Sequence, residues 1–157
     1  MFWIAVVPIA LVMFAAGWLV GKRVIGKPAD TSTLGDREAQ FVERMRNVTL
    51  EGTFTAVGEE RPPSPERYDI ASVQKVGPDS WRFNATLQCC GINGTIPVVV
   101  PMRWLGDTPV VMMTDTSVPG LGTFTVRVCF YADRYSGIWQ HGDRGGHMAG
   151  RILARSV

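Results

Sequence analysis

The residues whose types could support chemistry are few, and the most compact set is His141, Asp143 and His147. Imidazole and carboxylate groups are zinc ligands, but a zinc site needs three or four ligands that converge on the metal. These three residues lie in and beside the glycine-rich segment 142–146, where Arg144 places a positive charge among them. We therefore interpret the segment as a polar turn and expect no metal and no other cofactor.

Residue types that act as nucleophiles are present, but their spacing does not indicate a catalytic site. No serine stands in a G-x-S-x-G nucleophile elbow. A thiol–imidazole pair would form only if the fold brought Cys89 or Cys90 to a histidine. We predict that the chain is not an enzyme. The alternative is an enzyme whose site is built from loops and is not visible as a sequence motif.

The segments that must position any site begin with an apolar run at residues 2–20, which carries no charge. Nineteen residues of helix would be about 28 Å long, close to the thickness of the hydrocarbon core of a bilayer. Trp3 and Trp18 lie near its two ends, where indole rings prefer the membrane interface. We predict a retained transmembrane anchor at residues 1–21. A cleaved signal peptide is the weaker alternative, because no basic residue precedes the run.

The charge distribution bears on orientation and on partners. Lys22, Arg23 and Lys27 follow the apolar run, so the positive-inside rule favours a cytoplasmic location for the rest of the chain. The net charge is +2, but without these three residues 13 basic side chains face 14 acidic ones. No basic stripe remains, so nucleic acid is not an expected partner.

The chain after the anchor divides into a tether at residues 22–35 and one domain at residues 36–157. Residues 36–46 combine charged residues with Phe41, Val42 and Met45 at helical spacing, which predicts a short helix that covers the domain. From residue 48 the apolar period becomes two, as in Trp81, Phe83, Ala85 and Leu87. That alternation predicts half-buried strands. The expected strands are residues 48–56, 68–76, 81–88, 96–104, 109–115, 123–130, 135–140 and 147–153.

Short turns and the absence of helical crossovers favour a mainly β fold, an antiparallel up-and-down barrel of about eight strands. A β-sandwich is the alternative. Pro97 and Pro101 lie in one predicted strand, and each removes a backbone donor. We expect that strand to be bent, bulged or next to an opening in the barrel.

Four short motifs carry a resemblance to a family. They are residues 104–109 (WLGDTP), 119–124 (PGLGTF), 135–139 (YSGIW) and 145–150 (GGHMAG). In order and spacing they resemble an uncharacterised family of bacterial proteins in which a small β domain follows an N-terminal hydrophobic segment. The resemblance implies an extracytoplasmic domain and no particular activity. Gly137 to Trp139 is also similar to the G-x-W of lipocalin-like barrels, but lipocalins have it on the first strand.

Together these patterns predict a membrane-tethered, non-catalytic barrel that binds a small apolar ligand or a protein partner, or serves a structural role. An eight-stranded barrel can hold one small ligand or be filled by its own side chains. The large residues of inward parity would line the interior. They are Phe54, Trp81, Phe83, Phe124 and Phe130.

Overall fold

The computed structural model describes residues 34–89, 92–118 and 122–155. These residues form one helix, α2 (Asp36–Arg44), followed by eight strands. The strands are β1 (Val48–Phe54), β2 (Ser64–Lys75), β3 (Ser80–Cys89), β4 (Ile92–Leu105), β5 (Thr108–Val118), β6 (Gly122–Tyr131), β7 (Arg134–His141) and β8 (Arg144–Ala154). Every predicted strand is therefore present, and several begin earlier or end later than the alternation indicated.

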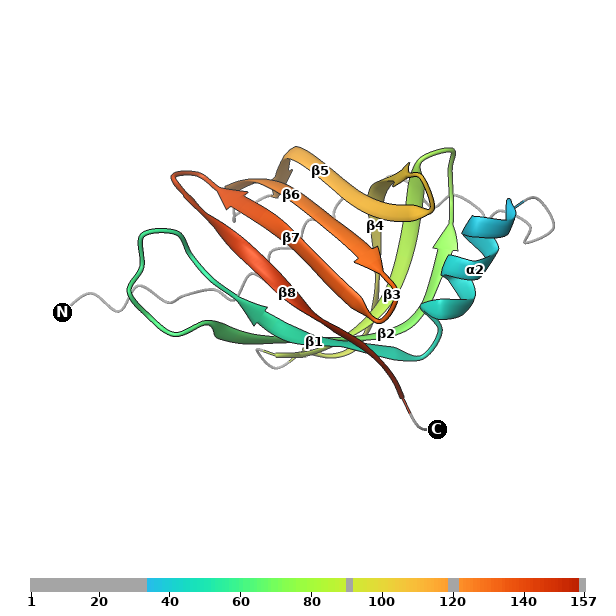
Figure 1. The fold of residues 1–157 in the computed structure, drawn as a ribbon, viewed down its shortest axis with the longest axis horizontal. Helices are drawn as coiled ribbons and strands as arrows, with labels where there is room; N and C mark the ends of the chain where they lie inside the picture. The colour runs from blue at the N-terminus through green and yellow to red at the C-terminus, as the bar shows by residue number, and fades with distance from the viewer. Residues whose placement is uncertain (1–33, 90–91, 119–121, 156–157) are drawn as a thin grey trace.

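The eight strands form a closed antiparallel barrel in sequence order (Figure 1). Each strand pairs with the next, and β8 closes the sheet by pairing with β1, where Gly52 lies opposite Gly150. The prediction of an up-and-down barrel is confirmed, and the sandwich alternative is wrong. Alternation is the cause: along β3 the side chains of Trp81, Phe83 and Ala85 are buried inside the barrel. The polar residues between them lie on the outer surface, because successive side chains of a strand point to opposite faces.

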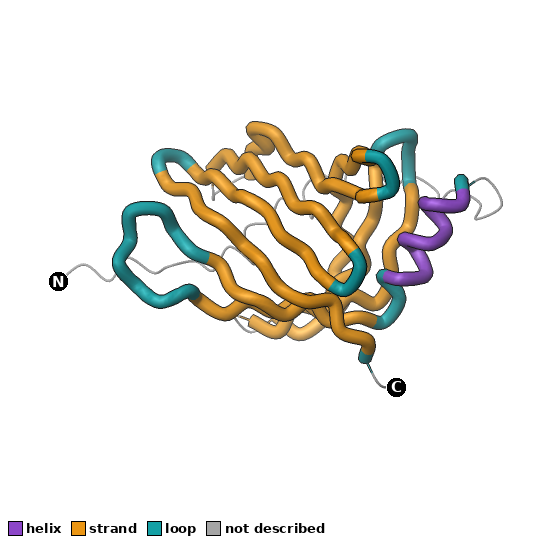
Figure 2. The backbone as a smooth tube through the Cα atoms, viewed as in Figure 1, coloured by secondary structure: helices purple, strands orange, loops and turns teal. Residues whose placement is uncertain are grey.

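The helix α2 covers one end of the barrel (Figure 2). Phe41 on its inner side and Met45, which directly follows the helix, are almost completely buried, as the helical spacing predicted. The Phe41 ring packs edge-on against Trp81 and Trp104, with ring centroids 5.8 and 6.0 Å apart. Lys75 and Glu38 form an ion pair of 2.7 Å between β2 and the helix. The helix is thus fixed to the barrel by one aromatic side chain that enters it and by polar contacts around that side chain.

Among the described residues, β4 and β5 have the fewest paired positions of any two neighbouring strands in the barrel. These strands have 14 and 11 residues, yet the pairing among the described residues joins only Met102–Leu105 with Thr108–Val111. Pro97 and Pro101 belong to the part of β4 that pairs with β3 but not with β5. Proline lacks the backbone donor that a ladder needs, so its presence here is consistent with an unpaired edge. The barrel is closed, and the expectation that this strand is irregular beside the prolines corresponds to the short β4–β5 pairing.

A bulge in β5 lies next to this short pairing. The register between β5 and β6 shifts between Met113 and Thr116, and Asp115 has a left-handed backbone with φ of 44°. The bulge is held by Thr125, whose hydroxyl accepts a hydrogen bond from the Asp115 amide and donates one to the Asp115 carboxylate, both at 3.0 Å. The Arg127 guanidinium donates to the Met113 carbonyl oxygen. A β-bulge bends its strand, and this one follows shortly after the last β5 residue that pairs with β4.

The predicted anchor at residues 1–21 and nearly all of the tether at residues 22–35 lie outside the described residues. Within the part of the chain that the structure describes, no helix is long and apolar enough to cross a membrane. The anchor therefore stays a prediction from the sequence.

Candidate ligand-binding cavity

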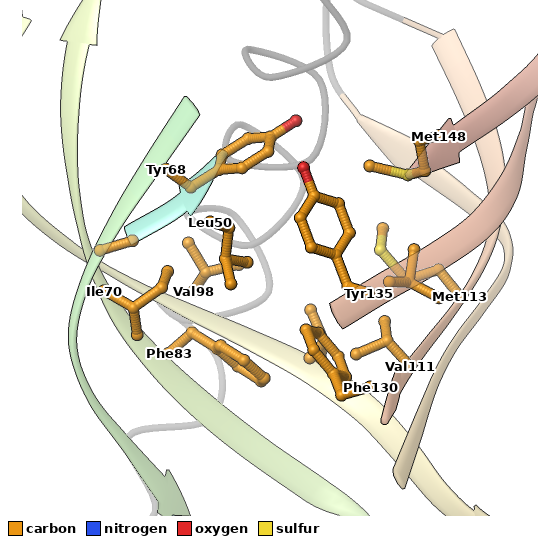
Figure 3. Close-up of a pocket in the computed structure, with 13 residues that line it drawn as sticks. Leu50, Tyr68, Ile70, Phe83, Val98, Val111, Met113, Phe130, Tyr135 and Met148 are labelled. Carbon is orange, nitrogen blue, oxygen red and sulfur yellow. The ribbon is translucent and has the colours of Figure 1, made fainter. Parts of the chain in front are cut away.

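A cavity of about 70 Å³ lies inside the barrel, and all eight strands contribute to its wall (Figure 3). The wall consists of aliphatic, aromatic and methionine side chains. They are Leu50, Tyr68, Ile70, Phe83, Ala85, Val98, Val100, Val111, Met113, Val128, Phe130, Tyr135 and Met148. Every one of them has inward parity on its strand, so the alternation that forms the barrel also makes its interior apolar.

The volume sets the size of a molecule that fits. A water-sized position needs about 10–15 Å³, so the cavity offers roughly five such positions. For comparison, an engineered cavity that accommodates benzene has a volume of about 150 Å³. That volume is roughly twice the volume of the cavity in this barrel. A molecule of about five non-hydrogen atoms therefore matches the cavity. Small wall residues such as Ala85 leave this room, since Ala85 is fully buried among much larger aromatic neighbours.

A buried carboxylate lies beside the cavity and is held by two tyrosines. The Tyr135 hydroxyl donates to Glu66 Oε1 at 2.7 Å, and the Tyr68 hydroxyl donates to Glu66 Oε2 at 3.0 Å. All three side chains are buried, with Glu66 only 5% exposed. The bridge joins β2 to β7 across the barrel interior, and its carboxylate is not part of the cavity wall.

Burial determines the protonation behaviour of this bridge. Loss of hydration raises the pKa of the Glu66 carboxyl above its ordinary value of 4.5, and the two phenol hydrogen bonds act in the opposite direction. Burial and the neighbouring carboxylate raise the pKa of both tyrosines, so their hydroxyls keep their protons at neutral pH. The hydroxyls therefore remain donors to Glu66.

Two glycines make room for the Tyr135 ring. Gly52 on β1 and Gly150 on β8 lie opposite each other beneath it. A Cβ atom at Gly52 would lie 2.6 Å from the Tyr135 hydroxyl oxygen, and one at Gly150 would lie 2.7 Å from a ring carbon. Only glycine at both positions lets the ring reach across two strands to Glu66.

The five large residues predicted to line the interior are all buried, but they have different neighbours. Only Phe83 and Phe130 line the cavity, where their rings stack at 6.2 Å. Trp81 packs against Phe41 of the helix. Phe54 packs on Trp139 at 6.5 Å, while Phe124 stacks on His141 at 4.1 Å. The interior is therefore mostly filled by its own side chains, and the cavity occupies only part of it.

The cavity lies directly behind the region where the described residues of β4 and β5 do not pair. Val98 and Val100 of its wall come from the part of β4 that does not pair with β5. Val111 and Met113 come from β5, next to the bulge. The least hydrogen-bonded part of the barrel wall thus separates the cavity from the outside.

In the described residues, His141, Asp143 and His147 around the turn at 142–146 do not come together as a metal centre. His141 stacks on Phe124, whereas His147 has the opposite parity and is exposed on the outer surface of β8. No group of three or more His, Cys, Asp or Glu side chains in the described part of the chain could hold a metal ion. That the whole protein holds no metal stays a prediction.

The sequence reasoning missed Glu66, Tyr68 and Tyr135 as a unit. The second strand was expected to begin at residue 68, so Glu66 was not assigned to a strand. The structure begins β2 at Ser64, which places Glu66 on the same inward face as Tyr68 and Ile70. The sequence did contain a signal for this site. Glu66 lies two residues before Tyr68, so in a strand both side chains point to the same face.

Comparisons of this chain with models of known protein families, with curated proteins and with solved structures found no match.

Proposed function

We propose that the chain is a membrane-tethered, non-catalytic binding module whose barrel holds one small apolar molecule. The observation that carries the proposal is the apolar cavity to which all eight strands contribute. Concave apolar sites with few polar groups are the usual form of small-molecule binding sites. A barrel that served only as a rigid scaffold would gain stability from filling this space, because unfilled volume in a core costs contacts.

The size of the cavity limits the affinity. The best small ligands gain about 1.5 kcal/mol per non-hydrogen atom. A ligand of roughly five such atoms then gains at most about 7.5 kcal/mol, which corresponds to a dissociation constant in the low micromolar range. We expect binding between micromolar and millimolar, which suits a reversible carrier or sensor better than a permanent cofactor site.

The predicted anchor suggests where the ligand is met, and the short pairing between β4 and β5 suggests how it enters the barrel. Residues 2–20 would hold the barrel at a membrane, where apolar molecules concentrate. The ligand would pass between β4 and β5, since these two strands have four paired positions, the fewest of any neighbouring strands among the residues that the structure describes. A protein partner that contacts the loops is the alternative occupant, and the binding experiment separates the two.

The test uses the full chain in lipid nanodiscs with ¹³C-labelled methionine methyl groups. Met113 and Met148 both line the cavity, so their methyl signals report directly on its contents. We expect 1-butanol, which has five non-hydrogen atoms, to shift both signals saturably.

A matched pair of variants makes the test specific. Ala85→Leu fills the cavity from β3 and should abolish the shift. Ala149→Leu adds the same side chain on the exposed face of β8 and should leave the shift unchanged. Absence of saturable binding in the unmodified chain, or equal binding in both variants, would contradict the proposal.

A further inference from the structure

We infer that the end of the barrel covered by α2 lies against the lipid bilayer, with two hairpin tips in the headgroup region and a basic surface around them. This inference rests on the proposed membrane tether and goes beyond it by naming the surface that contacts the lipid. It follows from the place where the described chain begins, from exposed apolar side chains, and from the distribution of charge between the two ends of the barrel.

The described chain begins at the α2 end of the barrel. Arg37, in the first turn of α2, donates to the Gly106 carbonyl oxygen at 2.9 Å, which places the start of the helix on the turn between β4 and β5 (Figure 1). Even at full extension, residues 22–33 would span only about 40 Å. The α2 end is therefore within reach of the predicted anchor, whereas the opposite end could face the bilayer only if the predicted tether ran back along the barrel.

Two hairpin tips at the α2 end expose large apolar side chains. Leu105 at the end of β4 is 76% exposed, and Tyr131 at the end of β6 is 64% exposed. Each is the last strand residue before a turn of two residues, 106–107 or 132–133. Leucine gains free energy by leaving water, and tyrosine prefers the membrane interface. Contact with the headgroup region would bury both side chains, which no other part of the described chain covers.

The tip at Leu105 also has the composition of a membrane-interface site. The preceding residue, Trp104, is half-buried, and the Arg37 guanidinium lies over its indole ring, 4.9 Å from the ring centroid. Arg44 on the same helix lies over the Phe41 ring at 5.7 Å. Both arginines are exposed, and among the described residues neither forms an ion pair. Their charges are thus not neutralised within the domain and can interact with lipid phosphates, which the guanidinium group fits.

The charge of the domain is divided between the two ends of the barrel. The described residues as a whole carry equal numbers of basic and acidic side chains. The α2 end, however, contains nine basic and six acidic side chains, in residues 34–47, 75–82, 103–108, 131–134 and 151–155. The described part of the opposite end contains two basic and four acidic ones, in residues 55–63, 115–118 and 142–144. An anionic bilayer surface therefore attracts the α2 end and repels the opposite end.

The test uses the full chain in nanodiscs that contain anionic lipid and a lipid with a gadolinium chelate on its headgroup. The readout is the paramagnetic relaxation of the ¹³C-labelled methionine methyl signals, which depends steeply on the distance from the bilayer surface. Met13 lies in the predicted anchor, so its signal reports on the tether itself.

The methionines of the barrel distinguish its two ends. Met45 directly follows α2, and the Met102 amide donates to the Asp79 carbonyl oxygen in the turn between β2 and β3, so both lie near the α2 end. Met148 pairs with Phe54, the last residue of β1, and lies near the opposite end. We expect the relaxation of Met45 and Met102 to exceed that of Met148 by at least about fivefold, since dipolar relaxation falls with the sixth power of distance and a strand rises about 3.3 Å per residue.

A matched pair of double variants tests the two tips. Leu105→Ser combined with Tyr131→Ser removes the apolar side chains and should reduce the ratio to less than about twofold, because the apolar area that would leave water is lost. Val57→Ser combined with Ile138→Ser makes the same change at positions that are 72% and 51% exposed but lie away from the α2 end. The control should leave the ratio unchanged. All four residues are exposed, so neither double variant should unfold the domain.

The outcomes separate this inference from the proposed function. If Met13 is not relaxed, the proposed tether fails and the inference fails with it. If Met13 is relaxed but Met102 and Met148 are relaxed equally, or Met148 more strongly, the tether stands and the inference is overturned. An unchanged ratio in the Leu105 and Tyr131 double variant, or an equal loss in the control, would also overturn it. Failure of 1-butanol to bind would contradict the proposed ligand site and leave the membrane contact standing.

Discussion

Replacing Tyr135 by phenylalanine tests the energetics of the buried bridge. The change removes one hydroxyl that donates to Glu66 at 2.7 Å and leaves the ring over Gly52 and Gly150. No cavity of methyl size is created, so the loss reflects the hydrogen bond alone. A hydrogen bond to an ionised group contributes about 1.5–3 kcal/mol, and one to a neutral group about 0.5–1.5 kcal/mol. We expect the larger loss where Glu66 is ionised.

The pH dependence follows from the direction of the pKa shift. The folded-state pKa of Glu66 is raised above 4.5, so its favourable contribution to folding is complete below that value. This contribution is lost as the pH rises through the folded-state pKa. Tyr135→Phe removes a bond that stabilises the ionised form, so it raises the folded-state pKa further. The destabilisation caused by the variant must therefore be greater at pH 8 than at pH 4.

The assay is reversible unfolding of the full chain followed by tryptophan fluorescence at both pH values. Tyr131→Phe is the matched control, because Tyr131 is 64% exposed and its loss should change stability by less than about 0.5 kcal/mol. In a double-mutant cycle, Glu66→Gln should remove most of the pH dependence. Equal losses for the two tyrosine variants, or a greater loss at pH 4, would refute this description of the bridge.

Three further predictions concern other parts of the chain. Phe41→Ala should lower stability by about 3–5 kcal/mol and release α2, whereas Gln40→Ala on the exposed side of the helix should be close to neutral; fluorescence melts would show both. His141→Ala and His147→Ala should leave the metal content of the purified protein unchanged, and a stoichiometric metal lost in both would contradict this. Residues 1–21 should remain on the mature protein and resist carbonate extraction from membranes; N-terminal sequencing that starts after residue 16 would show a cleaved signal instead.

The sequence was sufficient for the strands and the helix because their burial is periodic. Trp81, Phe83 and Ala85 alternate with polar residues over residues 81–86 of β3, so both the strand and its inner face could be predicted. Phe41 in a short helix and Met45 directly after it have helical spacing, which identified the buried side. The two prolines of β4 lie where the described residues of that strand pair with β3 only. In each case the signal is local and involves one element.

The cavity and the bridge could not be predicted because they depend on several strands at once. The volume beside Ala85 is what remains after side chains from all eight strands are packed, and no single strand determines it. Glu66 and Tyr135 are 69 positions apart and meet only through the register that places Gly52 opposite both Glu66 and Gly150. The bulge at Asp115 likewise depends on Thr125 of the neighbouring strand.

The most direct test of the binding function is a crystal structure of the full chain soaked with 3-bromopropan-1-ol, which also has five non-hydrogen atoms. Anomalous scattering locates the bromine without ambiguity. We predict one bromine inside the barrel against Phe83 and Phe130, and no such peak in Ala85→Leu. Bromine found only on the outer surface, or an internal peak that persists in Ala85→Leu, would contradict the claim that this barrel holds a ligand.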